Sequence, residues 1–233
     1  MIVKRKTSLR IRKIHRYLGI FIGLQFIMWT VSGLYFSWTD IDEIHGDQFK
    51  KLPPETIAFS NLKGIGDLLP GEAVTSVDLK DISGEPYYFI NSEKLVHAEN
   101  GKILNEISEE QALDIAARHV RDELQVSGIR KIDSLGAHHE YRGGSLPAYE
   151  ISYDTGENLK AYVGARDASF KSVRFRDWRW FDFLWMMHTM DYQTRDDFNN
   201  WLLRIFSVSG LVAVLSGFVL WYVSSPSVRK VLK

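Results

Sequence analysis

The sequence predicts an α+β protein in which two transmembrane helices flank an antiparallel domain of strands with few helices. Residues 17–38 and 205–224 form runs of 22 and 20 positions without a charged side chain. Either run is long enough to cross about 30 Å of hydrocarbon as a helix. Between them lie short segments rich in β-branched and aromatic residues, separated by turns, and their order repeats once along the chain.

The distribution of charge predicts how the chain is oriented in a membrane. All 29 acidic residues lie between Thr39 and Arg204, whereas the first 16 residues carry seven Lys or Arg and no acid. Because an excess of Lys and Arg beside a span marks the cytoplasmic side, we expect both termini in the cytoplasm and the central domain in the periplasm of a bacterial cytoplasmic (inner) membrane. The expected partner of the basic arm is the lipid bilayer, and nucleic acid is not expected.

These patterns divide the chain into six segments. In order, we expect a basic arm (1–16), a transmembrane helix (17–38), an extracytoplasmic α+β domain (55–176), an interfacial amphipathic segment (178–198), a second transmembrane helix (199–225) and a cytoplasmic tail (226–233). The first apolar run is longer than the core of a cleavable signal peptide and leaves through "YFSWTD", so we expect it to remain as an anchor. The prolines of "KLPPET" end any continuing helix.

The clearest helix of the central domain is "SEEQALDIAARHVRDEL", in which Ser108 and Gln111 form a capping box. The segment "GEPYYFINSEKLVHAENGKIL" reads like "SLPAYEISYDTGENLKAYVGARDASFKSV", since each has a proline followed by three strands and two turns. This similarity predicts two copies of a unit with one helix and three strands, the first helix being a weak one near "NLKGIGDLL". An earlier segment, "AVTSVDLKD", also reads as a strand.

The absence of cysteine excludes covalent c-type haem attachment, thiolate-bound iron–sulfur clusters and thiol redox chemistry, which leaves histidine as the main candidate for metal binding. Neither a dinucleotide fingerprint nor a nucleophile elbow is present. Four histidines, His97, His119, His138 and His139, fall in the central domain, where we expect surface or core roles. Neighbours such as His138 and His139 point to opposite faces of a strand, so we expect no zinc site there.

His15 lies near the cytoplasmic end of the first span, and Gly19 and Gly23 follow it at four-residue intervals on the same helical face. Small residues beside an imidazole leave space for a flat macrocycle or for close approach of another helix. The alternative is an interfacial histidine among lipid head groups.

His188 stands in "FLWMMHTMDY", on the apolar face of an expected helix, with Asp191 three residues further on. A carboxylate in that place is suited to accept the second ring N–H of a metal-bound imidazole and so to fix its tautomer. The alternative is an interfacial helix whose aromatic side chains form a membrane belt.

The order of "RKIHRYLGIFIGL", "SGL", "LPAYEISYD" and "RWFDFLWMMHTMDY" along nearly the whole chain resembles the PepSY-associated transmembrane family. Better-known members have four spans and include ferric-siderophore reductases, which are taken to carry b-type haem held by histidines. With two spans, this chain resembles a half-length member, and its "AYVGARDAS" departs from the usual "YvDxxTG" turn.

The resemblance implies a haem b protein that passes electrons outward, with His15 and His188 as iron ligands and ferric iron or a ferric chelate as the acceptor. Such a protein is a haem-dependent ferric reductase or an electron-transfer subunit. The alternative is a non-catalytic, membrane-anchored PepSY interaction or assembly subunit of a larger membrane complex.

One iron cannot bind both His15 and His188, because a helix from His15 to Trp38 rises about 35 Å. Either two haem levels exist or one of the two histidines is structural. His45 is the available partner at the outer level, and Met186 or Met187 are further candidates. A second copy of the chain, or another membrane subunit, is suited to supply the inner ligand and to restore four helices, and the electron donor is a quinol or another protein.

Overall fold

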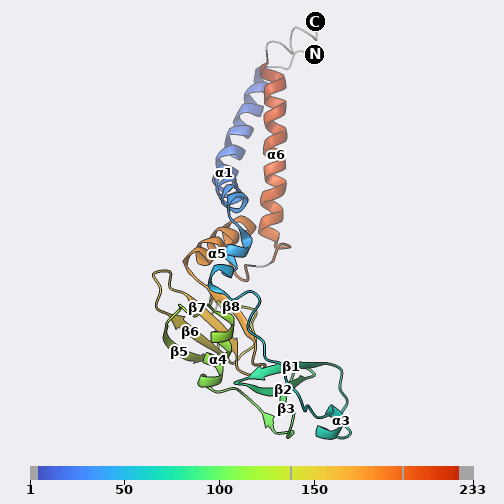
Figure 1. Cartoon of the computed structure of the whole chain (residues 1–233). Coiled ribbons are helices and arrows are strands. Elements are labelled where there is room, and N and C mark those ends of the chain that lie inside the picture. The colour runs from blue at the N-terminus through green and yellow to red at the C-terminus, as the bar shows by residue number, and fades with distance from the viewer. Residues whose placement is uncertain (1–4, 137, 196, 226–233) are drawn as a thin grey trace. The chain divides into compact units, whose positions relative to one another are not determined.

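The computed structural model describes residues 5–136, 138–195 and 197–225 (Figure 1). The expected tail 226–233 and the first four residues of the basic arm lie outside these described residues. The chain forms two compact units, one made of Met1–Thr39 and Asp182–Lys233 and the other of Asp40–Phe181. We refer to them as the helical unit and the α+β domain.

Two long helices make up most of the helical unit, as the sequence predicts. Helix α1 spans Arg5–Trp38 and α6 spans Trp201–Ser224, and both are long and apolar enough to cross a membrane. Because α1 already begins at Arg5, the basic arm from that residue onward belongs to the helix rather than to a separate segment. Asn200 caps α6 by accepting a hydrogen bond from the backbone N–H of Leu203 at 2.8 Å.

The two helices lie side by side (Figure 1) and pack through small and aromatic residues. Phe21 and Phe206 stack with their ring centroids 5.5 Å apart, and Gly210 lies against the ring of Phe26. Most of the remaining large apolar side chains of both helices point outward, for example Leu24, which is 73% exposed, and Phe218, which is 64% exposed. Apolar surface of this extent on two paired helices is typical of membrane-embedded helices.

Helix α5 spans Arg176–Thr189, and its residues from Asp182 onward belong to the helical unit. The sequence predicts an amphipathic segment over 178–198, and the structure resolves this range into a helix followed by a loop that leads to Asn200. Met190 directly after the helix adopts a left-handed backbone conformation with φ 56°. Such a conformation often ends helices, although glycine is the usual residue there.

The α+β domain contains two antiparallel sheets of four strands each, in the order β1-β2-β3-β4 and β5-β6-β7-β8. The strands of the first sheet are β1 (Val77–Ile82), β2 (Glu85–Ile90), β3 (Lys94–His97) and β4 (Ile103–Leu104). Those of the second sheet are β5 (Val126–Ile132), β6 (Ala148–Tyr153), β7 (Lys160–Gly164) and β8 (Phe170–Arg174). The short helical elements are α2 (Ile41–Ile44), η1 (Asp47–Phe49) and α3 (Ile65–Leu68), and the longer one is α4 (Glu109–His119).

The α+β class is confirmed, with one strand more in each half than the repeat predicts. A helix precedes each meander of strands, and the four-residue α3 is the weak first helix. The sequence does not predict strand β5, because the strand has one buried residue, Ile132, and therefore little hydrophobic alternation. The capping box of α4 is present, since Ser108 Oγ accepts from the N–H of Gln111 at 3.2 Å and Gln111 Oε1 accepts from the N–H of Ser108 at 2.9 Å.

A single large hydrophobic cluster joins the two sheets of the domain through α4. Ile115 of α4 lies in this cluster with Ile82 of the first sheet and Val163 of the second. Ile44 and Trp178, which are 3% and 9% exposed, belong to the same core. The compact domain is therefore longer at both ends than the range 55–176 expected from the sequence.

Candidate functional site

His188 lies in the last turn of α5 and faces the C-terminal part of α1. Its Nδ1 atom is 2.7 Å from the hydroxyl oxygen of Ser32, which is fully buried. The ring of Phe36 meets the imidazole edge to face, with the centroids 5.6 Å apart. The imidazole is half-buried, so it combines one fixed polar contact with an apolar surrounding.

The end of α5 is held by side chains that donate to its last carbonyl groups. Gln25 Nε2 donates to the carbonyl of Met187 at 3.0 Å, and Trp29 Nε1 donates to that of His188 at 2.7 Å. Asn200 Nδ2 donates to the carbonyl of Thr189 at 2.9 Å. These carbonyls have no partner within the helix itself, and leaving them unpaired in an apolar environment is costly.

Four residues of α1 that contact α5 share one face of the helix, because they follow one another at spacings of three and four. They are Gln25, Trp29, Ser32 and Phe36. None of the sequence motifs described above marks this face of α1 as a contact surface. Its signal is nevertheless present, since Gln25 and Ser32 are polar residues at helical spacing inside an uncharged span, where polar side chains usually have a specific partner.

Asp191 serves the loop after α5 rather than the ring of His188. Its carboxylate accepts hydrogen bonds from the backbone N–H groups of Gln193 and Thr194, both at 3.1 Å, and of Asp197 at 2.9 Å, as well as from the Thr194 hydroxyl. Burial favours the neutral acid, but these hydrogen bonds outweigh it and hold the pKa of Asp191 below its ordinary value. Ser32, and not Asp191 as the sequence suggests, is thus the hydrogen-bond partner of the His188 ring.

His15 makes a matching contact near the other end of the helix pair. Its Nδ1 atom is 2.8 Å from the hydroxyl oxygen of Ser216 on α6. Gly217 leaves room for the ring, since a Cβ atom at that position would lie 3.3 Å from His15 Cε1. At Gly19 and Gly23 a Cβ atom would meet nothing within 4 Å. No other described part of the chain therefore packs against these two glycines.

The two imidazoles lie at separate levels of the helical unit. His15 and Ser32, which contacts His188, are both on α1 and are 17 residues apart, a rise of about 25 Å. This separation excludes a common metal ion. Each level provides one imidazole that contacts a serine of another helix.

His45 belongs to the α+β domain, where it follows α2 and is exposed. It is therefore in a different compact unit from His188, and their pairing stays a prediction. Across residues 5–136, 138–195 and 197–225, no group of three or more His, Asp or Glu side chains is placed to hold a metal ion.

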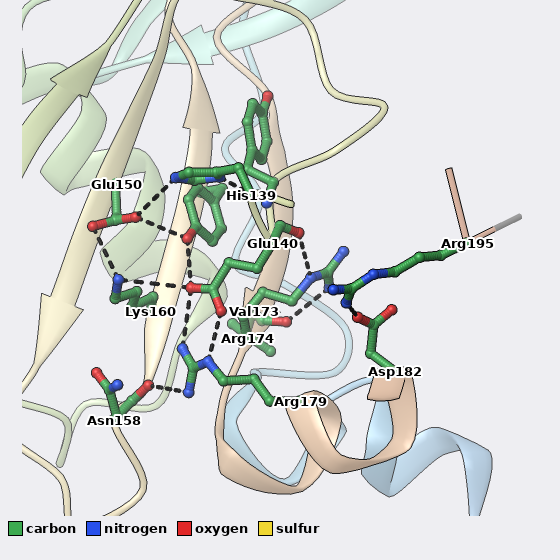
Figure 2. A network of polar contacts seen from close by, with 12 residues as sticks. His139, Glu140, Glu150, Asn158, Lys160, Val173, Arg174, Arg179, Asp182 and Arg195 are labelled. Carbon is green, nitrogen blue, oxygen red and sulfur yellow. Dashed lines mark hydrogen bonds and ion pairs between the residues drawn. The ribbon is translucent and has the colours of Figure 1, made fainter. Parts of the chain in front are cut away.

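A second polar cluster, which includes Glu140 and Glu150, lies in the α+β domain (Figure 2). The two carboxylates flank the hydroxyl of Tyr162. Tyr162 Oη is 2.7 Å from Glu140 and 2.9 Å from Glu150, although its single proton serves one carboxylate at a time. Arg179 of α5 binds Glu140 through two nitrogens at 2.6 and 3.0 Å, and Lys160 is 3.2 Å from Glu150. The cluster thus ties the first turns of α5 to the second sheet.

The charges of this cluster stabilise one another. Burial disfavours the ionised form of Glu140, but hydrogen bonds from Arg179 and Tyr162 hold its pKa below the ordinary value. The pKa of Glu150 is likewise lowered against the effect of burial, by Arg130 and Tyr162. Burial and the two carboxylates raise the pKa of Tyr162 far above its ordinary value, so the phenol remains protonated. We interpret the cluster as structural, because its charges are mutually paired.

Together, the fold and the site define a membrane protein with two spanning helices and an α+β domain between them. The chain belongs to the family described as the PepSY-associated TM region, whose model matches residues 1–223. This match confirms the assignment made from the sequence motifs. Searches of curated proteins and of solved structures found no match.

Proposed function

We propose that the protein binds haem b at two levels of its membrane helices and passes electrons across the bilayer. The observation that carries this proposal is the pair of imidazoles, His15 and His188, which lie at levels of α1 separated by a rise of about 25 Å. Such a separation matches a relay through most of the hydrocarbon thickness and does not suit a single metal site.

The donor chemistry of both histidines fits a b-type haem. Each imidazole contacts a serine through Nδ1, which leaves Nε2 as the nitrogen directed away from that hydrogen bond. Haem iron bound through such imidazoles would supply one-electron transfer. The chain would hold it by Nε2 coordination and by apolar side chains that keep water away, among them Phe36, which contacts the imidazole of His188, and Trp185, which contacts Phe36.

Each level offers one imidazole within the helical unit, so a second axial ligand must come from elsewhere. Within the chain, the candidates for the second ligand at the level of His188 are His45, Met186 and Met187. For His15, a second copy of the chain or another membrane subunit would supply the ligand. With a second copy of the chain, the complete site has four spanning helices, which enclose a macrocycle better than two.

The direction of transfer follows from the charge distribution. The seven basic residues that precede the first span favour a topology with both termini in the cytoplasm and the α+β domain in the periplasm of a bacterial cytoplasmic membrane. His15 would then take electrons on the inner side from a quinol or a protein donor, and His188 would deliver them outward to ferric iron or a ferric chelate. On this proposal the protein is a ferric reductase or an electron-transfer subunit.

The test is the reduced-minus-oxidised visible spectrum of the full-length protein, produced with ample haem. We expect a reducible haem b signal that His15→Ala and His188→Ala each diminish in part, because each removes one axial ligand at a different level. His138→Ala, which changes an exposed histidine of the α+β domain, is the control and should leave the spectrum unchanged. A wild-type protein without a haem signal would overturn the proposal.

A specific observation supports a second candidate function, that of a membrane-anchored interaction or assembly subunit. The α+β domain has a groove of about 310 Å³ whose walls include Phe59, Leu79 and Phe170 beside the polar Arg118 and His119. A groove with apolar walls and charged side chains beside them is suited to hold a peptide segment of a partner protein. If the spectrum shows no haem, this candidate becomes the better account of the chain.

A further inference from the structure

Each candidate imidazole contacts a serine whose hydroxyl proton already has an acceptor in its own helix. Ser32 Oγ lies 2.6 Å from the carbonyl oxygen of Met28, and Ser216 Oγ lies 2.7 Å from that of Ala213. Serine hydroxyls in helices commonly bond to a carbonyl three or four residues earlier. The same two oxygens face His188 Nδ1 and His15 Nδ1.

The single proton of each hydroxyl decides the direction of these contacts. If Ser32 donated to His188, its oxygen and the Met28 carbonyl would be two acceptors 2.6 Å apart with no proton between them. If Ser32 donates to Met28, its lone pair is available and the imidazole must donate. The same reasoning makes His15 the donor to Ser216.

A neutral imidazole with its proton on Nδ1 has a lone pair on Nε2. We propose that Ser32 and Ser216 are positioning residues, each of which fixes the tautomer and the ring orientation of its histidine and so presents Nε2 to a metal ion. The identity of that metal as haem iron rests on the proposed function. The fixed tautomer is inferred only from the contacts that each serine hydroxyl makes with a backbone carbonyl and with a histidine ring.

The two serines act on different histidines from different helices. Ser32 is on α1 and orients His188 of α5, whereas Ser216 is on α6 and orients His15 of α1. A hydrogen-bond acceptor on the far ring nitrogen makes an imidazole a stronger donor to the metal. Loss of either acceptor therefore favours the reduced iron at one level and leaves the other level unchanged.

Helix packing alone would give different behaviour. Serine and histidine side chains often join membrane helices by hydrogen bonds that contribute only to stability. In that case, removing a hydroxyl would lower the unfolding temperature without altering the protonated nitrogen of the histidine or the reduction potential of a bound haem. The tautomer and the potential therefore distinguish positioning from packing.

The test compares full-length wild type with Ser32→Ala, Ser216→Ala and the corresponding threonine variants, which keep a hydroxyl. The first measurement is ¹⁵N NMR of histidine-labelled protein before haem is added, and it reports which ring nitrogen carries the proton. The second is a redox titration of the haem-loaded protein. Ser37→Ala is the control on α1, since that hydroxyl is exposed and bonds to the Leu34 carbonyl of its own helix.

We expect each alanine variant to lose the Nδ1–H signal of one histidine and to raise one midpoint potential while the other stays in place. The threonine variants should restore both readouts, and Ser37→Ala should match wild type. Unchanged histidine signals and potentials in both alanine variants would overturn the positioning role and leave the proposed function standing. If the wild-type protein binds no haem but its histidine signals still depend on the serines, the proposed function is overturned and the fixed tautomer is confirmed.

Discussion

The indole nitrogen of Trp29 donates a hydrogen bond to the backbone carbonyl of His188 across 2.7 Å. Because the carbonyl lies at the end of α5, this bond fixes the place where the helix stops against α1. The histidine side chain of the same residue contacts Ser32, one turn further along α1. Backbone and side chain of His188 are thus held by two neighbouring positions of a single helix face.

We expect Trp29→Phe to destabilise the helical unit by about 1–3 kcal/mol, the usual cost of a buried acceptor that loses its donor. The measurements are thermal unfolding in detergent and hydrogen exchange of the peptide that contains His188. Trp221→Phe is the matched control, because Trp221 on α6 is 63% exposed. Equal exchange rates in the Trp29 variant and wild type would contradict the role of this bond.

In the α+β domain, the hydroxyl of Tyr162 is the shared hydrogen-bond donor between Glu140 and Glu150. We expect Tyr162→Phe to lower the unfolding free energy of the domain by about 1–3 kcal/mol, because both carboxylates then lose that donor. Denaturant titration is the measurement. Tyr153→Phe is the control, since Tyr153 is also buried but no hydrogen bond of its hydroxyl occurs among the described residues, and it should change little.

Acid should destabilise the domain through the same two glutamates. Their pKa values are lowered by folding, so their contribution to stability is complete above the unfolded value of about 4.3 and is lost as the pH falls through the folded values. We expect the unfolding free energy to decrease as the pH falls below about 4.3 and through the lower folded values. Glu150→Gln, measured over the same range, should show a shallower decrease, and an identical slope would rule out this carboxylate as a cause.

The boundaries of the compact domain predict which fragment folds alone. A fragment of residues 40–181 retains Ile44, Trp178 and the ion pair between Arg179 and Glu140, whereas a fragment of residues 55–175 lacks all three. We expect the longer fragment to unfold cooperatively and at a clearly higher temperature. Circular dichroism melts of the two fragments provide the comparison, and coincident curves would show that the terminal segments contribute nothing.

The open face of α1 at Gly19 and Gly23 predicts how two copies associate. A second set of small residues at four-residue spacing, Ser209, Ala213 and Gly217 on α6, is not free in the same way, since Ala213 is buried and Gly217 lies against His15. Gly19→Leu should therefore weaken a dimer in nanodiscs, as measured by sedimentation. Leu24→Ala, which changes another exposed side chain of α1 that does not share the face of the two glycines, should not. A monomeric wild type with full haem would contradict the dimer.

Local signals made much of the fold predictable. The two uncharged runs, the capping box at Ser108 and the aromatic strands that surround Tyr88 and Tyr149 each depend on neighbours within a few residues. Strand β5 was missed because its polar, mostly exposed residues lack alternation. Its place is determined by pairing with β6 rather than by its own sequence.

The candidate site was predictable only in part. His15 and His188 stand out as imidazoles beside apolar runs, but their serine partners are 201 and 156 residues away along the chain. No local pattern encodes contacts of that range. The nearby Asp191 was therefore the natural candidate to orient His188, and the structure shows that the backbone of its own loop satisfies that carboxylate instead.

The long separation between α1 and its partners on α5 also sets an order for biosynthesis. Gln25, Trp29 and Ser32 bind residues that the ribosome adds 156–162 positions later, which takes about 8–30 s at ordinary rates of translation. During that interval Ser32 can bond to Met28 within its own helix. The amide of Gln25 lacks its acceptor, because the carbonyl of Met187 has not yet been synthesised. The newly inserted first helix is consequently an incomplete structure, and a chain that stops short of α5 should be a preferred substrate for membrane quality control.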